Sequence, residues 1–391
     1  MTRVLLITAL LALLTPSVAH AIPAFARRYG VPCATCHTAI PRRNEFGDAF
    51  RKAGYRWPGL VDENAGVAPI EMRGVSAGRT LLPAQVPVAL STSLGATYTD
   101  DPNVEDSVAL GRPTINVLFG ASLGPHISAF GITTTEGQLE ELVLQLARPW
   151  GRPELNLRLG LIEQTTTLFK SNEALIGRFE IGSSALHGLA ISKARMGAEA
   201  NGTLFSRLFW AAGVVQDAGP ESPYDFYYHL SVKVGGMDFL GDEPDVDLED
   251  EKVIQDLTLT LAQWGYHGEV ETTAGVKVSS IRRYGLETRI GFRDVSLLAG
   301  AMVGNDRDLV TYVDDLSLTG FAELSYPIFS WLIPMYLYQY QDAESFLIER
   351  QKHDFGFVIL PLENVRVRAK VSLTDDDTSN EEAELQIFLA L

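Results

Sequence analysis

Hydrophobic and polar residues alternate along most of the chain from residue 86 onward. In 154–162, leucines at every second position alternate with Asn156 and Arg158, and 364–374 alternates apolar residues with arginine, lysine and serine. Successive side chains of a β-strand point to opposite faces, so this period of two predicts strands. It predicts seventeen of them, at 86–98, 113–123, 126–135, 138–147, 154–162, 188–199, 203–216, 225–236, 254–266, 270–280, 285–292, 294–303, 315–326, 331–341, 353–361, 364–374 and 381–391.

Two architectures fit such strands. In a soluble sandwich the apolar residues face a core, whereas in a membrane barrel they face lipid and the polar residues face the lumen. The candidates are close to the roughly 9–11 residues that a tilted strand needs to cross a bilayer, and residues 86–391 show no linker or repeat. We therefore predict an all-β fold, a transmembrane antiparallel β-barrel.

Bacterial single-chain barrels have even numbers of strands, so we expect 16 or 18. Since seventeen is odd, either 163–187 contains one more strand, or one of the two short elements predicted within 285–303 is not a strand.

The predicted connections differ in length and charge. Those at 124–125, 292–294 and 361–364 are short, as periplasmic turns of such barrels are. Longer, mostly acidic connections are expected together on the opposite side, at 99–112, 241–252, 304–314, 341–352 and 375–382. The connection 241–252 has seven carboxylates, which favours a solvated loop first and a cation-collecting surface second. Aromatic residues that gather near strand ends or run along strands are consistent with interfacial girdles: Phe209, Trp210, Tyr224, Phe226, Tyr227, Tyr228, Trp264, Tyr266, Phe329, Trp331, Tyr336, Tyr338 and Tyr340.

The N-terminal part has a different pattern. Residues 1–21 read as a signal peptide, with Arg3, an apolar run and small residues before the expected cleavage site. Residues 22–60 form a short segment rich in aromatic residues, with a helix predicted over 42–53. There Phe46, Ala49, Phe50 and Ala53 make one apolar stripe, Pro41 precedes the helix and Gly54 follows it. Residues 61–85 read as a linker, and 86–391 as the barrel.

The candidate chemistry lies in Cys33-Ala34-Thr35-Cys36-His37, which has the spacing of a covalent haem attachment site. Two thiols three positions apart can form thioether links to one porphyrin, and the adjacent imidazole of His37 can ligate its iron. A disulfide or a thioredoxin-like redox pair is a rival interpretation, but no βαβ pattern surrounds the motif. A structural zinc site needs about four ligands, and the chain has only two cysteines. We expect one covalent haem c.

The second axial ligand of the iron is less clear from the sequence. Met72 is the nearest methionine after His37 and is our candidate for a distal ligand, although a lone methionine often only fills space. Histidines further along the chain are rivals: His126, His187, His229, His267 and His353.

The N-terminal segment and the rest of the chain carry net charges of opposite sign. Residues 22–60 carry a net charge of +5, and 61–391 carry −23. An acidic chain of this kind argues against nucleic acid as a partner and favours cations or basic proteins. About 40 residues rarely form a core of their own, so the haem segment should dock on or inside the barrel.

The N-terminal segment resembles the fused monohaem cytochrome c–porins of the outer membrane, whose best known members oxidise ferrous iron. The resemblance is carried by the stretch 22–30, by Cys33, Cys36 and His37, and by the spacing of Gly47, Phe50, Gly54 and Tyr55. It implies a haem segment followed by a barrel. The chain ends in Leu391 rather than an aromatic residue and is compact for an iron-oxidising member. The resemblance therefore supports the presence of a haem and a barrel more strongly than it supports iron oxidation.

The leading functional hypothesis is an outer-membrane electron conduit, with the haem segment in or under the barrel lumen. An extracellular donor such as Fe²⁺ would reduce the haem, and a periplasmic cytochrome or other carrier would remove the electron, as in an iron:cytochrome c oxidoreductase. The alternatives are a transport porin with a haem-bearing plug or redox sensor, and a soluble periplasmic haem protein. The sequence shows no P-loop, nucleophile triad or metalloprotease motif.

Overall fold

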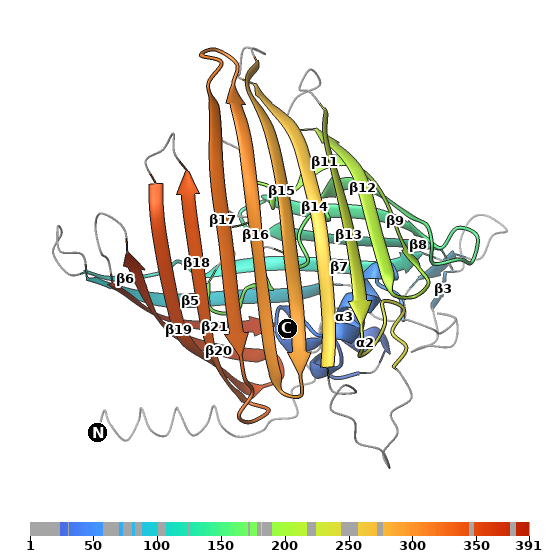
Figure 1. Cartoon of the computed structure of the whole chain (residues 1–391). Coiled ribbons are helices and arrows are strands. Elements are labelled where there is room, and N and C mark those ends of the chain that lie inside the picture. The colour runs from blue at the N-terminus through green and yellow to red at the C-terminus, as the bar shows by residue number, and fades with distance from the viewer. Residues whose placement is uncertain are drawn as a thin grey trace, which may run out of the picture.

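The computed structural model of the chain is a closed barrel of antiparallel strands (Figure 1). The structure describes residues 24–29, 31–57, 70–72, 80–82, 88–100, 107–123, 126–170, 173–177, 181, 190–216, 224–243, 257–271, 277–343, 348–375 and 381–390. The signal peptide predicted at 1–21 lies outside these residues, as does most of the linker predicted at 61–85.

Short elements precede the barrel. They are α2 (Ala24–Tyr29), the 3₁₀ turn η1 (Cys33–Thr35), the hairpin β1 (His37–Ala39) and β2 (Arg42–Arg43), α3 (Glu45–Lys52), and a second hairpin of β3 (Ile70–Met72) and β4 (Thr80–Leu82).

The barrel is built from the elements β5 to β21, each paired with its neighbours in the sequence. Their bounds are β5 Val88–Asp100, β6 Ser107–Leu110, β7 Thr114–Leu123, β8 Ile127–Thr134, β9 Leu139–Ala147, β10 Asn156–Ile162, β11 Arg195–Leu204, β12 Leu208–Gln216, β13 Tyr224–Val234, β14 Leu257–Glu271, β15 Lys277–Phe292, β16 Val295–Asp308, β17 Asp314–Ser325, β18 Leu332–Ala343, β19 Ile348–Leu362, β20 Val365–Asp375 and β21 Glu381–Ala390.

The barrel has 16 strands, because β6 and β7 are two pieces of one strand. The first half of β5 pairs with β7 (Ser93↔Thr114), and its second half pairs with β6 (Ala96↔Leu110). Strand β21 pairs with the other side of β5 and closes the sheet. A closed sheet has no unpaired edge, which is the condition for strands to cross a bilayer. Of the two strand numbers that we predicted, 16 and 18, the structure thus confirms 16.

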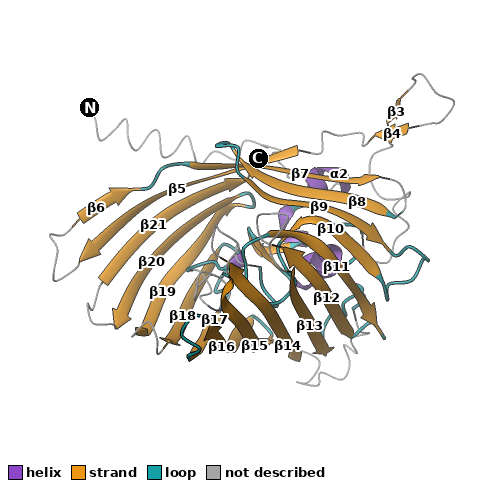
Figure 2. Ribbon diagram, turned by 90° about the horizontal axis from the view of Figure 1, so that it is seen from above, coloured by secondary structure: helices purple, strands orange, loops and turns teal. Residues whose placement is uncertain are grey.

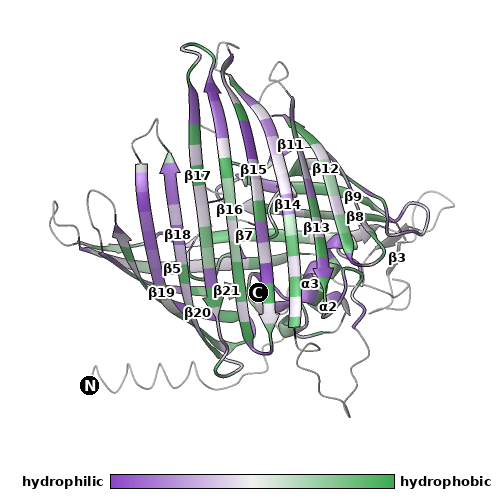
Figure 3. Cartoon of the chain, in the orientation of Figure 1, coloured by the Kyte–Doolittle hydropathy of each residue, from purple (hydrophilic) through white to green (hydrophobic). Residues whose placement is uncertain are grey.

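The exposure of side chains distinguishes a membrane barrel from a soluble sandwich. In β10, Leu159 is 54% exposed on the outer face, whereas Arg158 is 5% exposed on the inner face. Strand β20 repeats this, with Val371 exposed and Arg368 buried. Apolar and polar residues alternate along the strands drawn in Figure 3. A wall that is apolar outside and polar inside fits lipid around the barrel and excludes the soluble all-β alternative.

One of the seventeen predicted strands is false, and it is not one of those suspected. Both elements in 285–303 are real, as parts of β15 and β16, and no residue described within 163–187 belongs to a strand. The candidate 270–280 instead spans the end of β14 and the start of β15. These strands have 15 and 16 residues, longer than a bilayer requires, so one long hairpin was divided into too many elements.

Because of this surplus strand, the prediction also placed the acidic loop 241–252 at the wrong end of the barrel. Turns 205–207, 293–294 and 363–364 lie at one end of the barrel, which we call the short-turn end. The connection between β13 and β14, which contains 241–252, starts and finishes at this same end because strands alternate in direction. The other four acidic connections join strands at the opposite end, as predicted.

The predicted helix over 42–53 is shorter in the structure. Helix α3 begins at Glu45, because the Asn44 side chain accepts a hydrogen bond from the backbone N–H of Gly47 at 2.9 Å and caps it. Pro41 lies in the turn between β1 and β2 and not at the first helical position. Arg42 and Arg43 are therefore extended, and their side chains reach into the barrel.

Residues 24–57, which we call the plug, sit at the short-turn end. Figure 1 shows α2 and α3 near the lower ends of the strands, and Figure 2 shows helices inside the ring of strands. Residues 22–60 were expected to dock on or inside the barrel, and their described part does so, whereas the haem predicted there stays a prediction. No helix among the described residues has the length and apolar composition that a membrane-spanning helix requires.

A charged residue on the outer wall should prevent insertion. We expect Leu159→Arg to destabilise the barrel by about 2–4 kcal/mol, since lipid cannot solvate the guanidinium. Heat-dependent migration of the membrane-extracted protein on a gel measures the folded fraction. Val310→Arg, in the exposed connection between β16 and β17, is the control and should fold normally. Equal folding of both variants would contradict the assignment of the outer face.

Candidate haem-binding segment and its docking in the barrel

The Cys-x-x-Cys-His motif forms a compact turn. Cys33 opens η1, and the backbone N–H of Cys36 donates to the Cys33 carbonyl at 3.1 Å. Both cysteines are free thiols, so the rival disulfide is not formed. Burial raises the pKa of Cys33 and raises that of Cys36 to about 11. The motif keeps both thiols available on one turn.

His37 is held in the form that ligates iron. Its Nδ1 lies 3.3 Å from the Arg42 carbonyl, so the neutral tautomer donates Nδ1–H there and leaves the lone pair of Nε2 free. Burial and the nearby Arg43 guanidinium lower the pKa of His37, which favours the neutral imidazole. A backbone carbonyl that fixes the ring in this way is typical of metal-ligating histidines.

Helix α3 packs directly on the motif because residue 47 is glycine. A Cβ atom at Gly47 would lie 2.1 Å from the Cys36 carbonyl oxygen. A larger residue at position 47 would therefore push α3 away from the motif.

An aromatic cluster forms the apolar part of the plug. Phe50 has its ring centroid 5.3 Å from that of Phe25 and 5.7 Å from that of Tyr29. Tyr55 stacks on Phe25 at 5.4 Å and on Phe130 of β8 at 4.7 Å, so the cluster continues into the barrel wall. The aromatic residues noted in the sequence are thus gathered in one place.

These residues fit a covalent haem: two free thiols on one turn, a neutral imidazole with a free Nε2, and aromatic side chains close by. A haem held there by Cys33, Cys36 and His37 would supply one-electron transfer. Among the described residues, no group of three or more histidine, cysteine or acidic side chains is suited to a bare metal ion.

The structure separates the candidates for the distal ligand. Met72 lies in β3, which Figures 1 and 2 draw outside the barrel wall, and its role stays a prediction. His267 and His353 lie on the outer wall, where they contact Tyr284 and Tyr336. His229 faces the lumen, with Nδ1 2.6 Å from the Thr166 carbonyl. His126 lies in the turn before β8, and His187 lies outside the described residues.

Ion pairs join the plug to the rest of the chain. Arg42 forms a two-pronged pair with Glu323 of β17, in which Nη2 donates to Oε2 at 2.8 Å. Arg42 Nε also donates to the Glu173 carbonyl at 3.0 Å, and Arg43 lies 2.6 Å from the Glu173 carboxylate. The side chains of Arg42 and Glu323 are 7% and 0% exposed, so neither charge has water as an alternative partner.

The Cys-x-x-Cys-His motif itself contacts the short-turn end. The backbone N–H of Cys33 donates to the carboxylate of Glu363, in the turn between β19 and β20, at 3.1 Å. Arg366 donates to the Ile40 carbonyl at 2.9 Å, and Cys33, Ile40 and Ala390 pack in one small apolar cluster. The motif therefore lies next to the last two strands of the barrel.

A second anchor lies at the end of α3. Lys52 pairs with Asp48, and its ammonium lies 4.8 Å from the ring centroid of Phe209 and 4.5 Å from that of Phe239. Burial alone would raise the pKa of Asp48, but Lys52, Arg51 and Arg43 hold it well below its usual range. The carboxylate is thus charged in the docked plug.

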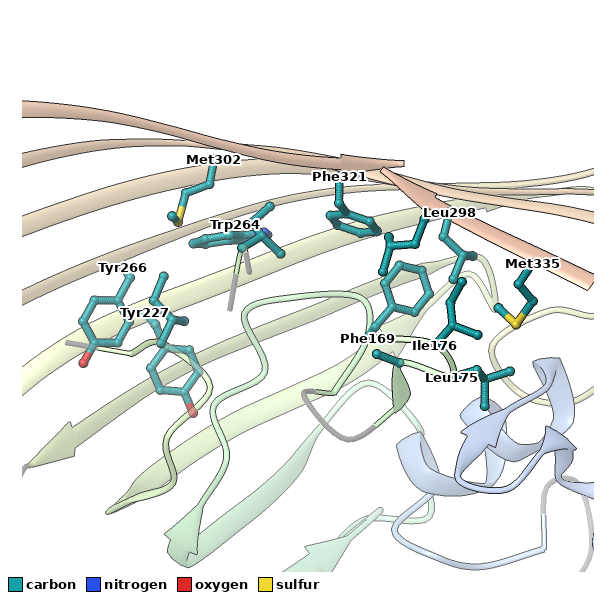
Figure 4. Close-up of a cluster of buried hydrophobic side chains, with 14 of the residues drawn as sticks. Phe169, Leu175, Ile176, Tyr227, Trp264, Tyr266, Leu298, Met302, Phe321 and Met335 are labelled. Carbon is teal, nitrogen blue, oxygen red and sulfur yellow. The ribbon is translucent and has the colours of Figure 1, made fainter. Parts of the chain in front are cut away.

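The lumen beyond the plug is also occupied. The connection between β10 and β11 folds inward, and we call its described residues (163–170, 173–177, 181 and 190–194) the inner segment. Phe169, Leu175 and Ile176 pack against Leu298, Phe321 and Met335 of the wall (Figure 4).

Charged wall residues hold this inner segment. Lys170 donates to Glu141 at 2.7 Å, and the backbone N–H of Leu168 donates to Glu287 at 2.7 Å. Arg158 bridges Glu199 at 2.9 Å and the hydroxyl of Thr165 at 3.0 Å. The sequence did not predict that the described part of 163–187 folds into the lumen, and the lack of clear alternation there was its signal.

The aromatic residues interpreted as membrane girdles do not all lie on the outer surface. Tyr224, Phe226, Phe329 and Trp331 are exposed on the outer surface, as that interpretation requires. Four others are buried, so the girdle assignment was wrong for Phe209, Tyr227, Trp264 and Tyr266. Alternation alone could have shown the difference for Tyr227, which points opposite to Phe226.

No known protein-family model matches the sequence, and no curated protein matches it. Solved structures resemble the fold. An anion-selective porin from Comamonas acidovorans has a TM-score of 0.58 and 12% identity, over 78% of this chain and 99% of that one. Salmonella typhi OmpF, in complex with daunomycin, has a TM-score of 0.56 and 11% identity, over 78% and 97%. The outer-membrane channel DcaP of Acinetobacter baumannii has 0.53 and 13%, over 83% and 100%. The chain has the fold of outer-membrane porins, as predicted.

The pair of Arg42 and Glu323 can be tested by replacing one partner or both. We expect Glu323→Gln to weaken plug docking by about 3–5 kcal/mol, since Arg42 would stay buried without a counter-charge. The double variant Arg42→Met with Glu323→Leu should recover most of this loss, because it buries no charge. The urea dependence of trypsin protection of the plug measures the effect. Additive losses in the double variant would show that the two side chains do not act as a pair.

Docking of the plug should weaken in acid through Asp48. Because the pKa of Asp48 in the docked plug lies below its ordinary value of 3.8, the stabilisation is full above that value and is lost as the pH falls below it. Hydrogen-exchange protection factors of α3 at pH 5 and pH 3 measure this. Asp48→Asn should have lower protection at pH 5 and a smaller change between the two values. An unchanged pH dependence in the variant would assign the effect to another group.

Proposed function

We propose that the chain is an outer-membrane electron-transfer protein that carries one covalent haem in the plug of its barrel. The observation that carries the proposal is the state of the motif: two free thiols and a neutral His37 with Nδ1 bonded to a carbonyl, seated inside the barrel by Glu363. Such an arrangement has no evident use in a simple pore. A haem attached there would exchange single electrons between the two sides of the membrane.

The filled lumen supports this proposal. The plug occupies the short-turn end, and the inner segment packs against the wall beyond it. An electron can pass through packed side chains, whereas a solute needs an open water-filled path. Arg42 holds the plug to Glu323 of the wall, and Arg43 holds it to Glu173 of the inner segment.

The two ends of the barrel suggest the partners. Four acidic connections at the end opposite the plug are suited to collect an extracellular cation such as Fe²⁺. The motif lies at the short-turn end, which is the periplasmic end in barrels of this kind, and a soluble cytochrome or other carrier would dock there. The reaction class would be that of an iron:cytochrome c oxidoreductase, with extracellular Fe²⁺ or another reductant as donor.

A second function is favoured by the fold. The structural neighbours are porins and a channel, so a transport porin with a haem-bearing plug or redox sensor is the alternative. Transport would require the plug to move, and the ion pairs of Arg42 and Arg43 would have to break. The two functions predict different measurements on the purified protein.

Haem attachment can be tested directly. We expect the wild-type protein to keep peroxidase-active haem on a denaturing gel, and Cys33→Ala to lose most of this signal, because a thioether survives denaturation only where the thiol is present. Thr35→Ala, within the same turn, is the control. A wild-type band without haem would refute the proposal.

Electron transfer is then separated from transport by two measurements. Stopped-flow mixing with Fe²⁺ should reduce the haem of the intact protein, whereas planar bilayers containing it should show little conductance. Stable open channels together with a haem that no external donor reduces would favour the transport porin.

A further inference from the structure

A cavity of about 400 Å³ lies where the plug meets β14 to β18 at the short-turn end. The plug contributes Thr38 and the stretch 42–45, the inner segment contributes Leu175, and the wall contributes the remaining side chains. None of the haem-attaching residues lines it. The cavity is therefore a site separate from the thiols and the imidazole, although the hairpin that follows His37 forms one of its sides.

Arg289 of β15 lines this cavity. Its guanidinium carbon lies 4.9 Å from the ring centroid of Phe169. The carboxylates of Asp48, Glu173 and Glu45 attract this guanidinium from a distance, but among the described residues none of them forms a direct hydrogen bond or ion pair with it. Arginine keeps its charge at any physiological pH, so its donors remain available. An aromatic ring covers one face of the guanidinium and leaves the edge with its N–H groups for a ligand.

The other polar groups of the cavity are mostly donors or already paired. Hydroxyl groups of Thr258, Ser296 and Ser325 line it. Two carboxylates line it as well, and one of them, Glu45, is held by Lys233 at 3.3 Å and by the backbone N–H of Met237 at 3.2 Å. The second is Asp294, in the exposed turn between β15 and β16.

The arginines of the cavity outnumber its carboxylates. Arg42 and Arg43 are paired with Glu323 and Glu173, and Arg293 adds a fourth guanidinium at the rim. Guanidinium and hydroxyl donors around a small cavity are the groups that recognise carboxylate and phosphate oxygens.

We propose that this cavity binds a carboxylate or phosphate group, with Arg289 as the residue that contacts it. Two sources supply such an oxyanion. One is a free anion that enters from the periplasmic side. The other is a propionate of a haem attached at Cys33 and Cys36, whose attachment turn is followed directly by the hairpin that lines the cavity. The second source rests on the proposed function, and the first does not.

The experiment compares the full-length protein in detergent with and without haem. Haem-free protein is made as the double variant Cys33→Ala, Cys36→Ala. Each form is titrated with inorganic phosphate and with succinate by calorimetry, and Arg289→Gln is introduced into both. Arg282→Gln is the matched control, because Arg282 lies on the same strand with its side chain exposed on the outer wall. Heat-dependent gel migration confirms folding of each variant.

If both forms bind the added anion, the ligand is a free anion. The affinity should then fall at least about tenfold in Arg289→Gln and stay unchanged in Arg282→Gln, since one charge-assisted hydrogen bond is worth about one decade in affinity. Binding by the haem-free form alone identifies the propionate. In that case Arg289→Gln should also shift the infrared carboxylate band and the reduction potential of the haem-loaded protein.

The proposal is overturned if neither form binds either anion and the spectra of the haem-loaded protein are the same in the wild type and in the Arg289→Gln variant. It is also overturned if Arg289→Gln binds as tightly as the wild type. Should that variant fail to fold, Arg289→Lys keeps the charge but loses the planar fork, and weaker binding by it is the expected result. If the wild-type chain carries no haem, the proposed function fails, and the phosphate and succinate titrations still decide this inference.

Discussion

Pairing of charges inside the barrel is the constraint on which the rest of this structure depends. The outer wall must be apolar, so alternation places the polar residues of every strand toward the lumen, where Arg158, Glu199 and Glu323 are almost fully buried. Charges in such a place are tolerated only with partners. The inner segment and the plug supply many of those partners, through Lys170 and Arg42. The polar inner face of the wall therefore needs the plug and the inner segment as partners, and these two segments need the charges of the wall to stay in place.

Local periodicity in the sequence was enough to predict the barrel, because alternation, strand length and turn residues all act within a few neighbouring positions. It could not place the boundary between β14 and β15, since alternation continues across 270–280 and nothing local marks where a long strand leaves the membrane. The helix start was missed for a similar reason. Arg42 and Arg43 have good helix propensity, but their partners Glu323 and Glu173 lie far away in the sequence.

The candidate site, too, could be predicted only in part from the sequence. Cys33, Cys36 and His37 could be singled out because their spacing is that of a covalent haem attachment site, and the aromatic cluster around Phe50 followed from composition. The carbonyl that orients His37, the carboxylate of Glu363 and the place of Arg289 at the cavity could not be foreseen. Each depends on contacts between segments more than a hundred residues apart, or on a turn whose course the sequence does not reveal. For the same reason, lumen-facing His229 could not be separated from His267 on the outer wall.

The burial of Cys33 beside the final strands has a consequence for biogenesis. Its side chain is 7% exposed and packs with Ile40 and Ala390, so docking of the plug against the last strand encloses it. Any enzyme that modifies this thiol has to act while the exported polypeptide is still unfolded in the periplasm. Under the proposed function, attachment of a haem at Cys33 would therefore come before the plug docks in the barrel.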